Sequence, residues 1–360
     1  TNHNNRSTFL RRNLRQLYHI RNMVMYNIWN KWDPLEVCML GNNYAPEFFN
    51  GIPDQAGDPL KRICEETLED LDEYKKVLQD FGVEVIQPEL DPRERFLDNT
   101  TKPRGPLQPR DFQLVLGNTC FTTEQDHVSI ANKLIEYDPE NTICIDKDQF
   151  PISSATAFYF DNCLLIGETR VSKDVLFLLE NDYNSIKKII KTHTDLDINI
   201  QLSPMEGHTD ANFHTLKPGV ILSLFDVQNY NKTFPGWDIC YLPDQSWEMV
   251  ADFLSLKRKN KGKWYLAGEA NNDEFINFVE TWLQEWVGYV EETVFDVNVL
   301  MLDESHCCVS NPNNQQVNTF LKKHNIEPVY VPFRHRYFWD GGLHCITLDL
   351  KRRNIKKEAQ

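Results

Sequence analysis

Residues 336–350 read RYFWDGGLHCITLDL and end in an apolar run, one of the short β-type runs that decide the fold class. Such runs recur along the chain, separated by amphipathic segments of helical spacing. We expect strands at 35–41, 83–89, 112–123, 141–146, 162–168, 198–203, 219–225, 238–243, 297–302, 327–333 and 345–350. We expect helices at 60–81, 124–136, 172–192, 245–257, 272–288 and 314–324, several with Asp, Ser or Asn as N-cap. The pattern predicts a mixed α/β protein.

The organisation of the chain favours one compact body, because no low-complexity linker divides it. Two hairpins are expected, with turns at 161–162 and 217–219. The proline-containing stretch 90–110 is expected to form a loop over a site. The sequence contains neither the G-x-G-x-x-G run that a Rossmann fold needs nor a P-loop run.

The composition is that of a globular protein, with 41% hydrophobic and 25% charged residues. The net charge of −15 argues against nucleic acid as a partner. No apolar run reaches the length of a membrane span, so no membrane partner is expected either. An acidic surface suits cationic ligands, although simple solubility explains it equally well.

The nine cysteines are an odd number, and none forms a C-x-x-C pair. Several lie within apolar runs, such as Cys38 in EVCMLG and Cys163 in NCLLIG. This usage predicts reduced, mostly buried thiols in a cytoplasmic setting, with no disulfide framework and no zinc site.

Residues 1–32 form a basic N-terminal arm that differs from the remainder, 33–360. They carry six basic side chains and no acid, which is +6 against −21 for the rest, and together these give the −15. We expect the arm to pack on the acidic body, and an organelle-targeting segment is the alternative.

Two segments combine residue types that suit a site for a cationic, planar substrate. In QPRDFQLVLGN, residues 108–118, Asp111 stands directly before an apolar run. In MEGHTDANFH, residues 205–214, Glu206, His208 and Asp210 are close together. Carboxylates can accept paired N–H bonds from a guanidinium group. The plainer interpretation is that Asp111 caps a strand and that His208 and Asp210 form an ordinary turn.

The third segment is the opening one, where two glycines and His344 lead to Cys345. A cysteine nucleophile needs a histidine to move protons, and a Gly-Gly turn leaves room for a ligand near the backbone. Cys345 can equally be one more buried thiol among nine. Spacing alone does not prove that Asp111, His208 and Cys345 converge.

Five segments together resemble the amidinotransferase family that includes the glycine and inosamine-phosphate enzymes. WDPLEVCMLGN resembles the opening of the family's sequences, and QPRDFQLVLGN is similar to their PRD segment. GHTDANFHTLKPGVILS looks like their His-x-Asp segment with its hairpin. VNVLMLDE and DGGLHCITLDLKRR are similar to the penultimate strand and the C-terminal cysteine segment. The chain is thereby identified as a member of this family, with phage-encoded relatives expected nearest.

The resemblance implies a pentein-type, five-bladed α/β-propeller in which pseudo-repeats surround a central channel. It implies Cys345 as nucleophile and His208 as general acid and base, with Asp111 and Asp210 binding the guanidinium. An arginine-like donor would transfer its amidino group to the cysteine and then to an amine acceptor, and no cofactor or metal would be required.

The sequence departs from the family pattern at several positions. The family Asp that orients the histidine matches Ser153 or Ser154 in FPISSATAFYF. Glu206 or Asp161 can substitute for it. A family arginine for the donor carboxylate matches Val227. Glu291 and Glu292 match small hydroxyl residues of the family at the substrate rim. These changes imply a different donor or acceptor, with more positive character than glycine, or reduced catalysis.

Three functions follow from these residues. The first is an amidinotransferase acting on an unidentified amine, and the second is a guanidine-modifying hydrolase that uses water as acceptor. The third is a catalytically impaired binding or structural protein of the same fold. The acceptor and the assembly state, including a homo-oligomer, stay open at this point.

Overall fold

The computed structural model describes residues 25–90, 105–122, 128–160, 163–167, 180–194, 196–203, 208–224, 234–242, 262–287 and 296–354. Within these residues, fifteen strands form five three-stranded sheets. The first sheet contains β15 (Thr347–Arg352), β1 (Leu35–Leu40) and β2 (Glu84–Ile86). The others, in chain order, are β3 (Leu114–Leu116), β4 (Thr119–Thr122) and β5 (Thr142–Cys144); β6 (Ala157–Phe160), β7 (Cys163–Gly167) and β8 (Asn199–Ser203); β9 (Phe213–Lys217), β10 (Val220–Ser223) and β11 (Asp238–Tyr241); β12 (Leu300–Asp303), β13 (His306–Val309) and β14 (Glu327–Tyr330).

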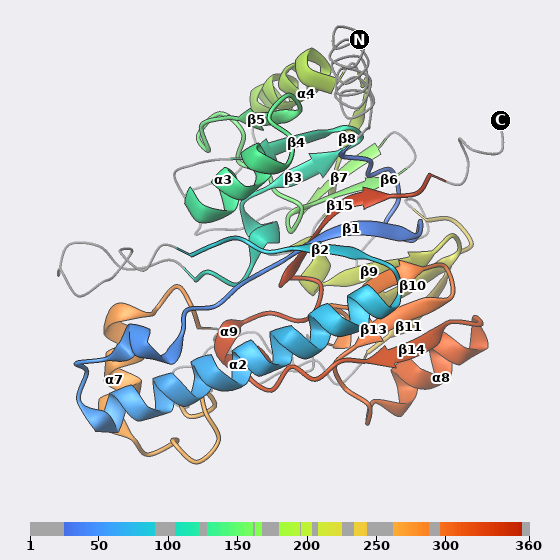
Figure 1. The fold of residues 1–360 in the computed structure, drawn as a ribbon. Helices are drawn as coiled ribbons and strands as arrows, with labels where there is room; N and C mark the ends of the chain where they lie inside the picture. The colour runs from blue at the N-terminus through green and yellow to red at the C-terminus, as the bar shows by residue number, and fades with distance from the viewer. Residues whose placement is uncertain are drawn as a thin grey trace, which may run out of the picture.

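All five sheets share one strand pattern. The first two strands pair antiparallel, and the third pairs parallel with the second. A parallel pair needs a crossover, and α-helices commonly provide it. Such a helix is described in four of the five sheets: α2 (Asp54–Asp80), α3 (Val128–Tyr137), α4 (Glu180–Thr194) and α8 (Gln315–Lys323). The chain is therefore a repeat of one small α/β unit (Figure 1).

The first sheet differs from the rest because it joins distant ends of the described chain. Its strand β15 lies antiparallel to β1, with Leu40 opposite Thr347. The pairing continues one step further, since the Gly41 amide donates to the Ile346 carbonyl at 2.8 Å. Cys345 directly precedes this paired segment.

Two further helices and a 3-10 turn pack against α2. They are α7 (Asp273–Trp282), α9 (Arg336–Trp339) and the 3-10 turn η1 (Pro46–Phe49). Figure 1 shows α7 beside the N-terminal end of the long helix α2. Leu60, Ile63 and Leu71 lie on one face of α2 and pack in a core with Phe275 and Trp339. Burying each such side chain contributes roughly 1.5–3 kcal/mol to stability.

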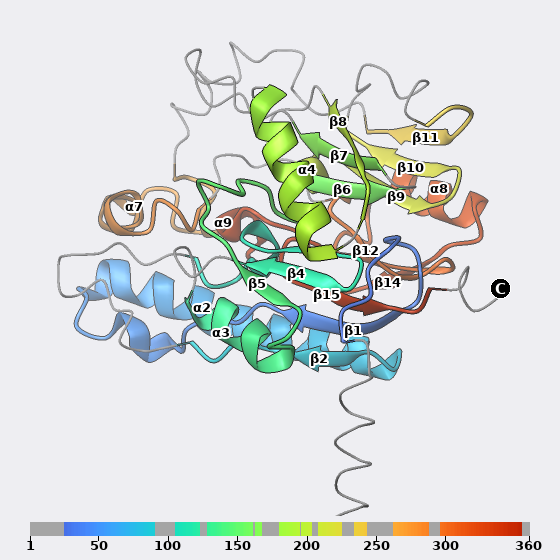
Figure 2. The same ribbon diagram turned by 90° about the horizontal axis from the view of Figure 1, so that it is seen from above.

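The sheets also pack directly on one another. In Figure 2 the sheet β6–β7–β8 lies beside the sheet β9–β10–β11. Phe158 and Leu165 of the former share a buried cluster with Phe213 and Ile221 of the latter. This contact brings the starts of β6 and β9 close together.

Most predicted elements are present, and the differences have local causes. The run 112–123 is a hairpin of β3 and β4, so the prediction of a single strand was wrong. Gly117 at the turn has a φ of 57°, which suits glycine and reverses the chain. The hairpin at 217–219 is confirmed, with Gly219 at a φ of 86°. Strand β13 was not predicted, and the helix expected at 245–257 lies outside the described residues.

A buried ion cluster ties the last strand to other parts of the chain. Asp349 on β15 accepts from Arg110 Nη2 at 2.7 Å and from Arg352 Nε at 2.8 Å. Burial alone would raise the pKa of Asp349, but the charges of Arg352 and Arg110 outweigh burial and hold this pKa below its usual range. Arg110 Nε also donates to the carbonyls of His344 and Thr347, both at 2.9 Å. The cluster therefore anchors the segment on both sides of Cys345.

Replacing Asp349 by Asn should reduce the free energy of unfolding by about 3–5 kcal/mol, because two buried arginines lose their counter-charge. Urea denaturation measures this loss. Asp238→Asn is the matched control, since Asp238 pairs with Lys323 at the surface and exposed pairs contribute about 1 kcal/mol or less. Equal losses in the two variants would contradict the structural role of the cluster.

Candidate active site

The predicted site residues lie just before the first strand of successive sheets. Asp111 precedes β3, Ser153 precedes β6, Asp210 precedes β9 and Cys345 precedes β15. Asn298 holds the same place before β12, although the sequence did not single it out. The signal that could have found Asn298 is the internal repeat, which becomes visible once the strands are aligned.

Cys345 is 5% exposed and is held by two neighbours from other sheets. Its Sγ lies 3.7 Å from Asp210 Oδ2. Asn298 Nδ2 donates to the same Sγ at 3.0 Å and to the Asp210 carbonyl at the same distance. The structure thus brings Cys345 and Asp210 together, as the chemistry of the sequence suggested.

Asp210 is also anchored by the residue next to the cysteine. His344 Nδ1 lies 2.7 Å from Asp210 Oδ2, and both side chains are 1% exposed. Burial and the nearby Arg110 push the pKa of His344 well below its ordinary value, so the imidazole is neutral and Nδ1–H donates. The other oxygen, Oδ1, has no hydrogen-bond partner in the described part of the chain. One oxygen of the carboxylate is therefore fixed, and the other is buried without a hydrogen bond.

His208 and Asp111 form a second pair. Their Nδ1 and Oδ1 atoms are 3.7 Å apart, and the side chains are 40% and 24% exposed. Asp111 Oδ1 makes no hydrogen bond to any residue the structure describes. This pair is the more open part of the site, where a proton can be exchanged with an incoming or departing group.

The serines expected to replace the orienting Asp have partners elsewhere. Ser153 Oγ accepts from the Ala155 amide at 3.3 Å, and Ser154 Oγ accepts from the Val115 amide at 3.3 Å. Their turn touches the histidine segment through its backbone, because Thr209 N donates to the Ala155 carbonyl at 2.7 Å. The charged group found beside the imidazole is Asp111.

Several predicted positions lie outside the described residues. They are Asp161, Glu206, Val227, Glu291, Glu292, and residues 1–24 of the basic arm. The same holds for 91–104, most of the stretch expected to form a loop over the site.

Each of the two glycines before the cysteine avoids a different steric clash. A Cβ on Gly341 would lie 3.0 Å from Cys345 Cβ, so a side chain there would crowd the nucleophile. A Cβ on Gly342 would lie 2.7 Å from both Cβ and Oδ1 of Asn298. The glycine pair thus gives space both to the thiol and to its amide neighbour.

Comparisons with known proteins agree with this geometry. No protein-family model matches the chain. Mitochondrial glycine amidinotransferase of Xenopus laevis is 22% identical over 389 residues, covering 90% of this chain and 82% of the relative. The chain is a relative of the amidinotransferases.

Two solved amidinotransferase structures share its fold. SxtG of the saxitoxin biosynthetic pathway, from Microseira wollei, has a TM-score of 0.61 at 19% identity and covers 91% of this chain and 98% of its own. Inosamine-phosphate amidinotransferase StrB1 from Streptomyces griseus has a TM-score of 0.61 at 16% identity, covering 92% and 97%. The expected relationship to the amidinotransferases is confirmed. The five three-stranded sheets are consistent with the expected propeller-like α/β arrangement.

The electrostatics of this amidinotransferase relative keep the cysteine protonated at rest. Burial and the carboxylates of Asp210 and Asp111 raise the pKa of Cys345 well above its ordinary value. A positive charge placed between those carboxylates would oppose this effect. The arrangement therefore couples the reactivity of the thiol to the binding of a cation.

The surroundings of the pair His208 and Asp111 raise the pKa of both side chains. Burial raises the pKa of Asp111 to about 6, while the charge of His208 opposes the rise. For His208, burial lowers the pKa, but Asp111, Asp210 and Asp340 outweigh it and leave a net increase. The neighbouring carboxylates thus favour the protonated imidazole of His208, which suits a group that donates a proton.

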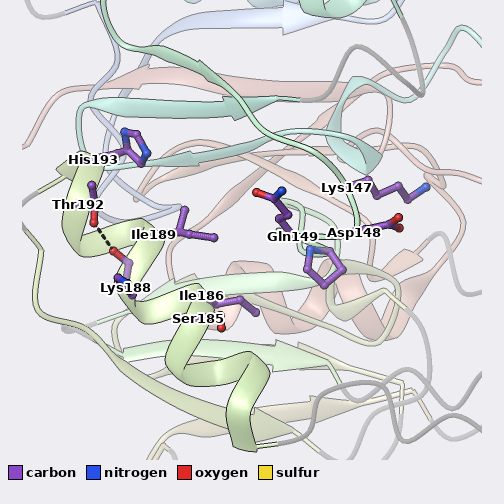
Figure 3. Close-up of a pocket in the computed structure, with 10 residues that line it drawn as sticks. Lys147, Asp148, Gln149, Ser185, Ile186, Lys188, Ile189, Thr192 and His193 are labelled. Carbon is purple, nitrogen blue, oxygen red and sulfur yellow. Dashed lines mark hydrogen bonds between the residues drawn. The ribbon is translucent and has the colours of Figure 1, made fainter.

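A pocket of about 580 Å³ opens beside Asp111, which lines it together with Gln108, Glu285 and Asp340. A larger pocket of about 780 Å³ lies between α4 and residues 147–151 (Figure 3). Of the predicted site residues within the described part of the chain, Asp111 lines the smaller pocket and none lines the larger one.

Two further observations concern the described residues as a set. They contain no group of three His, Cys, Asp or Glu side chains arranged to hold a metal ion. None of the helices they form is both long enough and apolar enough to cross a bilayer.

Alkylation of Cys345 tests its resting state. At pH 8 iodoacetamide should modify Cys345 slowly, and Asp210→Asn should accelerate the reaction roughly tenfold or more, because a neighbouring negative charge is lost. The asparagine oxygen still accepts from His344, so the local structure is retained. Peptide mass mapping measures the rate, with the exposed Cys144 as reference within each sample. A slower reaction in the variant would contradict the proposed electrostatics.

Proposed function

We propose that the protein is an amidinotransferase, which moves an amidino group from an arginine-like guanidino donor to an amine acceptor through Cys345. The observation that carries the proposal is the 3.7 Å approach of Cys345 Sγ to Asp210 Oδ2. Both Asp210 and Asp111 have an Oδ1 atom without a partner among the described residues. A guanidinium group can fill both positions with N–H donors and present its central carbon to the sulfur.

In the first half-reaction, the Cys345 thiolate attacks the guanidinium carbon and forms a C–S bond. His208 then donates a proton to the departing nitrogen, and the bond from that nitrogen to the carbon breaks. The donor leaves as a primary amine, and an amidino group remains on the sulfur. Asp111 and Asp210 hold the positive charge in place throughout.

In the second half-reaction, the acceptor amine attacks the amidino carbon. His208 accepts a proton from the amine, the C–S bond breaks and the thiolate is regenerated. The exposure of His208, at 40%, is in keeping with this role, because the same imidazole must meet two different amines.

We infer that the donor itself activates the nucleophile. The two carboxylates disfavour the thiolate while the site is empty, and a bound guanidinium neutralises them. The thiolate then forms mainly when a substrate is present, which limits side reactions of the cysteine. The proton released by the thiol can pass to the solvent-exposed pair.

The finer points of architecture belong to the same proposal. We infer that the five sheets form a five-bladed pentein-type propeller over 33–360, with the site in its central channel. Residues 1–32 form the basic arm. A cytoplasmic setting and a phage origin stay predictions from the sequence, as does self-association.

A catalytically impaired binding protein is the second candidate, and Ser153 favours it. The Ser153 hydroxyl bonds within its own turn and cannot stabilise an imidazolium as a carboxylate does. Asp111 stands beside His208 instead and can supply the negative charge. Turnover measurements decide between these roles.

Replacing Cys345 by Ala should abolish turnover and leave guanidine binding largely intact. Incubation of the wild-type protein with arginine or another guanidine, without acceptor, should add the mass of one amidino group. Intact-protein mass spectrometry detects this adduct. Cys144→Ala is the control, since this exposed cysteine lies outside the site, and it should still form the adduct.

Full activity in Cys345→Ala would overturn the mechanism. A urea-type product from the wild-type adduct would indicate hydrolysis in place of transfer. Donor binding without any adduct would support the impaired binding protein.

Donor affinity should fall as the pH drops through about 6, where Asp111 takes up a proton and loses its charge. Protonation of His208 acts in the same direction, because it adds positive charge beside a cationic ligand. Titration calorimetry in the Cys345→Ala background measures binding without turnover. Asp111→Asn should weaken binding at pH 8 by about tenfold or more and flatten the pH dependence. A wild-type pH profile in Asp111→Asn would exclude Asp111 from donor binding.

A further inference from the structure

We propose that Asn298 is a positioning residue that holds the Cys345 sulfur for attack and favours its thiolate form. The inference rests on the proposed function, in which that sulfur is the nucleophile. Asn298 is 1% exposed and stands just before β12, in the place where the other sheets contribute Asp111, Asp210 and Cys345. It is thus the contribution of the fifth sheet to the site.

The side-chain amide of Asn298 uses its full hydrogen-bonding capacity at this point. Its Oδ1 accepts from the amides of His344 and Cys345, at 3.0 Å and 2.9 Å. Its two Nδ2 hydrogens serve Cys345 Sγ and the Asp210 carbonyl, both at 3.0 Å. One planar group therefore fixes the nucleophile, its backbone and the segment of the carboxylate that faces it.

The direction of the contact to sulfur follows from the chemistry of the amide. An NH₂ group has hydrogens to donate and no lone pair to offer, so the sulfur must accept. A thiolate accepts a hydrogen bond more strongly than a thiol, and a donor of this kind therefore favours the charged form. Asn298 therefore lowers the pKa of the Cys345 thiol, whereas the carboxylates of Asp210 and Asp111 raise it.

The charged groups around the sulfur disfavour the thiolate, and a hydrogen-bond donor to the sulfur counteracts them. Asp210 and Asp111, from the segments before β9 and β3, both disfavour the thiolate. His344 is neutral and bonded to Asp210, and His208 lies beyond Asp111. Asn298 and the Gly342 backbone favour the thiolate. A bound guanidinium neutralises the charge of the two carboxylates, and Asn298 then holds the sulfur in position to attack the guanidinium carbon.

Gly342 supports the assignment independently. Its missing side chain makes room for Asn298, because a Cβ there would lie 2.7 Å from Asn298 Oδ1 and 2.9 Å from the Asn298 carbonyl. Any larger residue at 342 would displace the amide from the sulfur. The glycine and the asparagine thus form one matched pair.

The test compares the rate of Cys345 alkylation by iodoacetamide at a fixed pH below the thiol pKa, where the rate follows the thiolate fraction. Asn298→Asp keeps the shape and the acceptor for two backbone amides but replaces the donor by a carboxylate oxygen. Asn298→Ala removes the donor without adding charge. It provides the same test if the Asn298→Asp variant does not fold. Both should alkylate more slowly, the Asp variant by about tenfold or more.

Asn318→Asp is the matched control, because Asn318 is also buried and its Nδ2 donates to the Pro312 carbonyl at 3.0 Å. It should leave the Cys345 rate unchanged. A merely structural role for Asn298 would loosen the site in the variants and raise the rate, whereas the proposal requires a fall. An unchanged or higher rate in Asn298→Ala would overturn it.

The alkylation assay needs no guanidino donor, so it separates this inference from the proposed function. If the wild-type protein forms no amidino adduct with any donor, the proposed function fails while the alkylation rates still test Asn298. If the adduct forms, its rate of formation should fall in Asn298→Ala by at least as much as the alkylation rate.

Discussion

The pairing of β1 with β15 is the constraint on which the rest of the structure depends. It joins strands from the two ends of the described chain. It also fixes the position of Cys345, which directly precedes the paired segment. Asp349 strengthens this pairing from within, because it binds Arg352 on its own strand and Arg110 from the segment before β3. Arg110 in turn holds the carbonyl of His344. The position of the nucleophile therefore depends on contacts between distant segments and not on a local turn alone.

The site combines two opposing requirements in a small space. Carboxylates are needed to bind a guanidinium, yet they disfavour the thiolate that must attack it. One oxygen of Asp210 is fixed by His344, and the other is buried without a hydrogen-bond partner among the described residues. Asn298 supplies a donor to the sulfur that does not depend on ligand. In the proposed mechanism the bound cation supplies the remaining stabilisation, which makes the reactivity of the thiol depend on the substrate.

Repetition of one α/β unit explains how such a site can be assembled from distant residues. Each sheet begins with a polar segment at the same end, so five short segments meet although they are far apart in sequence. The segments differ in what they contribute to the site. Ser153 is an instance, since its hydroxyl serves its own turn while Asp111 stands beside His208.

The sequence by itself determined the α/β class and most strands and helices, because periodicity is a local property. It singled out Asp111, His208, Asp210 and Cys345 as candidates through their side-chain chemistry. It could not show that Gly117 reverses the chain within 112–123, since a positive φ is set by the hairpin as a whole. The role of Asn298 was also hidden, because a lone asparagine before a strand has no chemical signature. Its four hydrogen bonds join residues that are 46 to 88 positions away. Only the tertiary structure brings such groups within bonding distance.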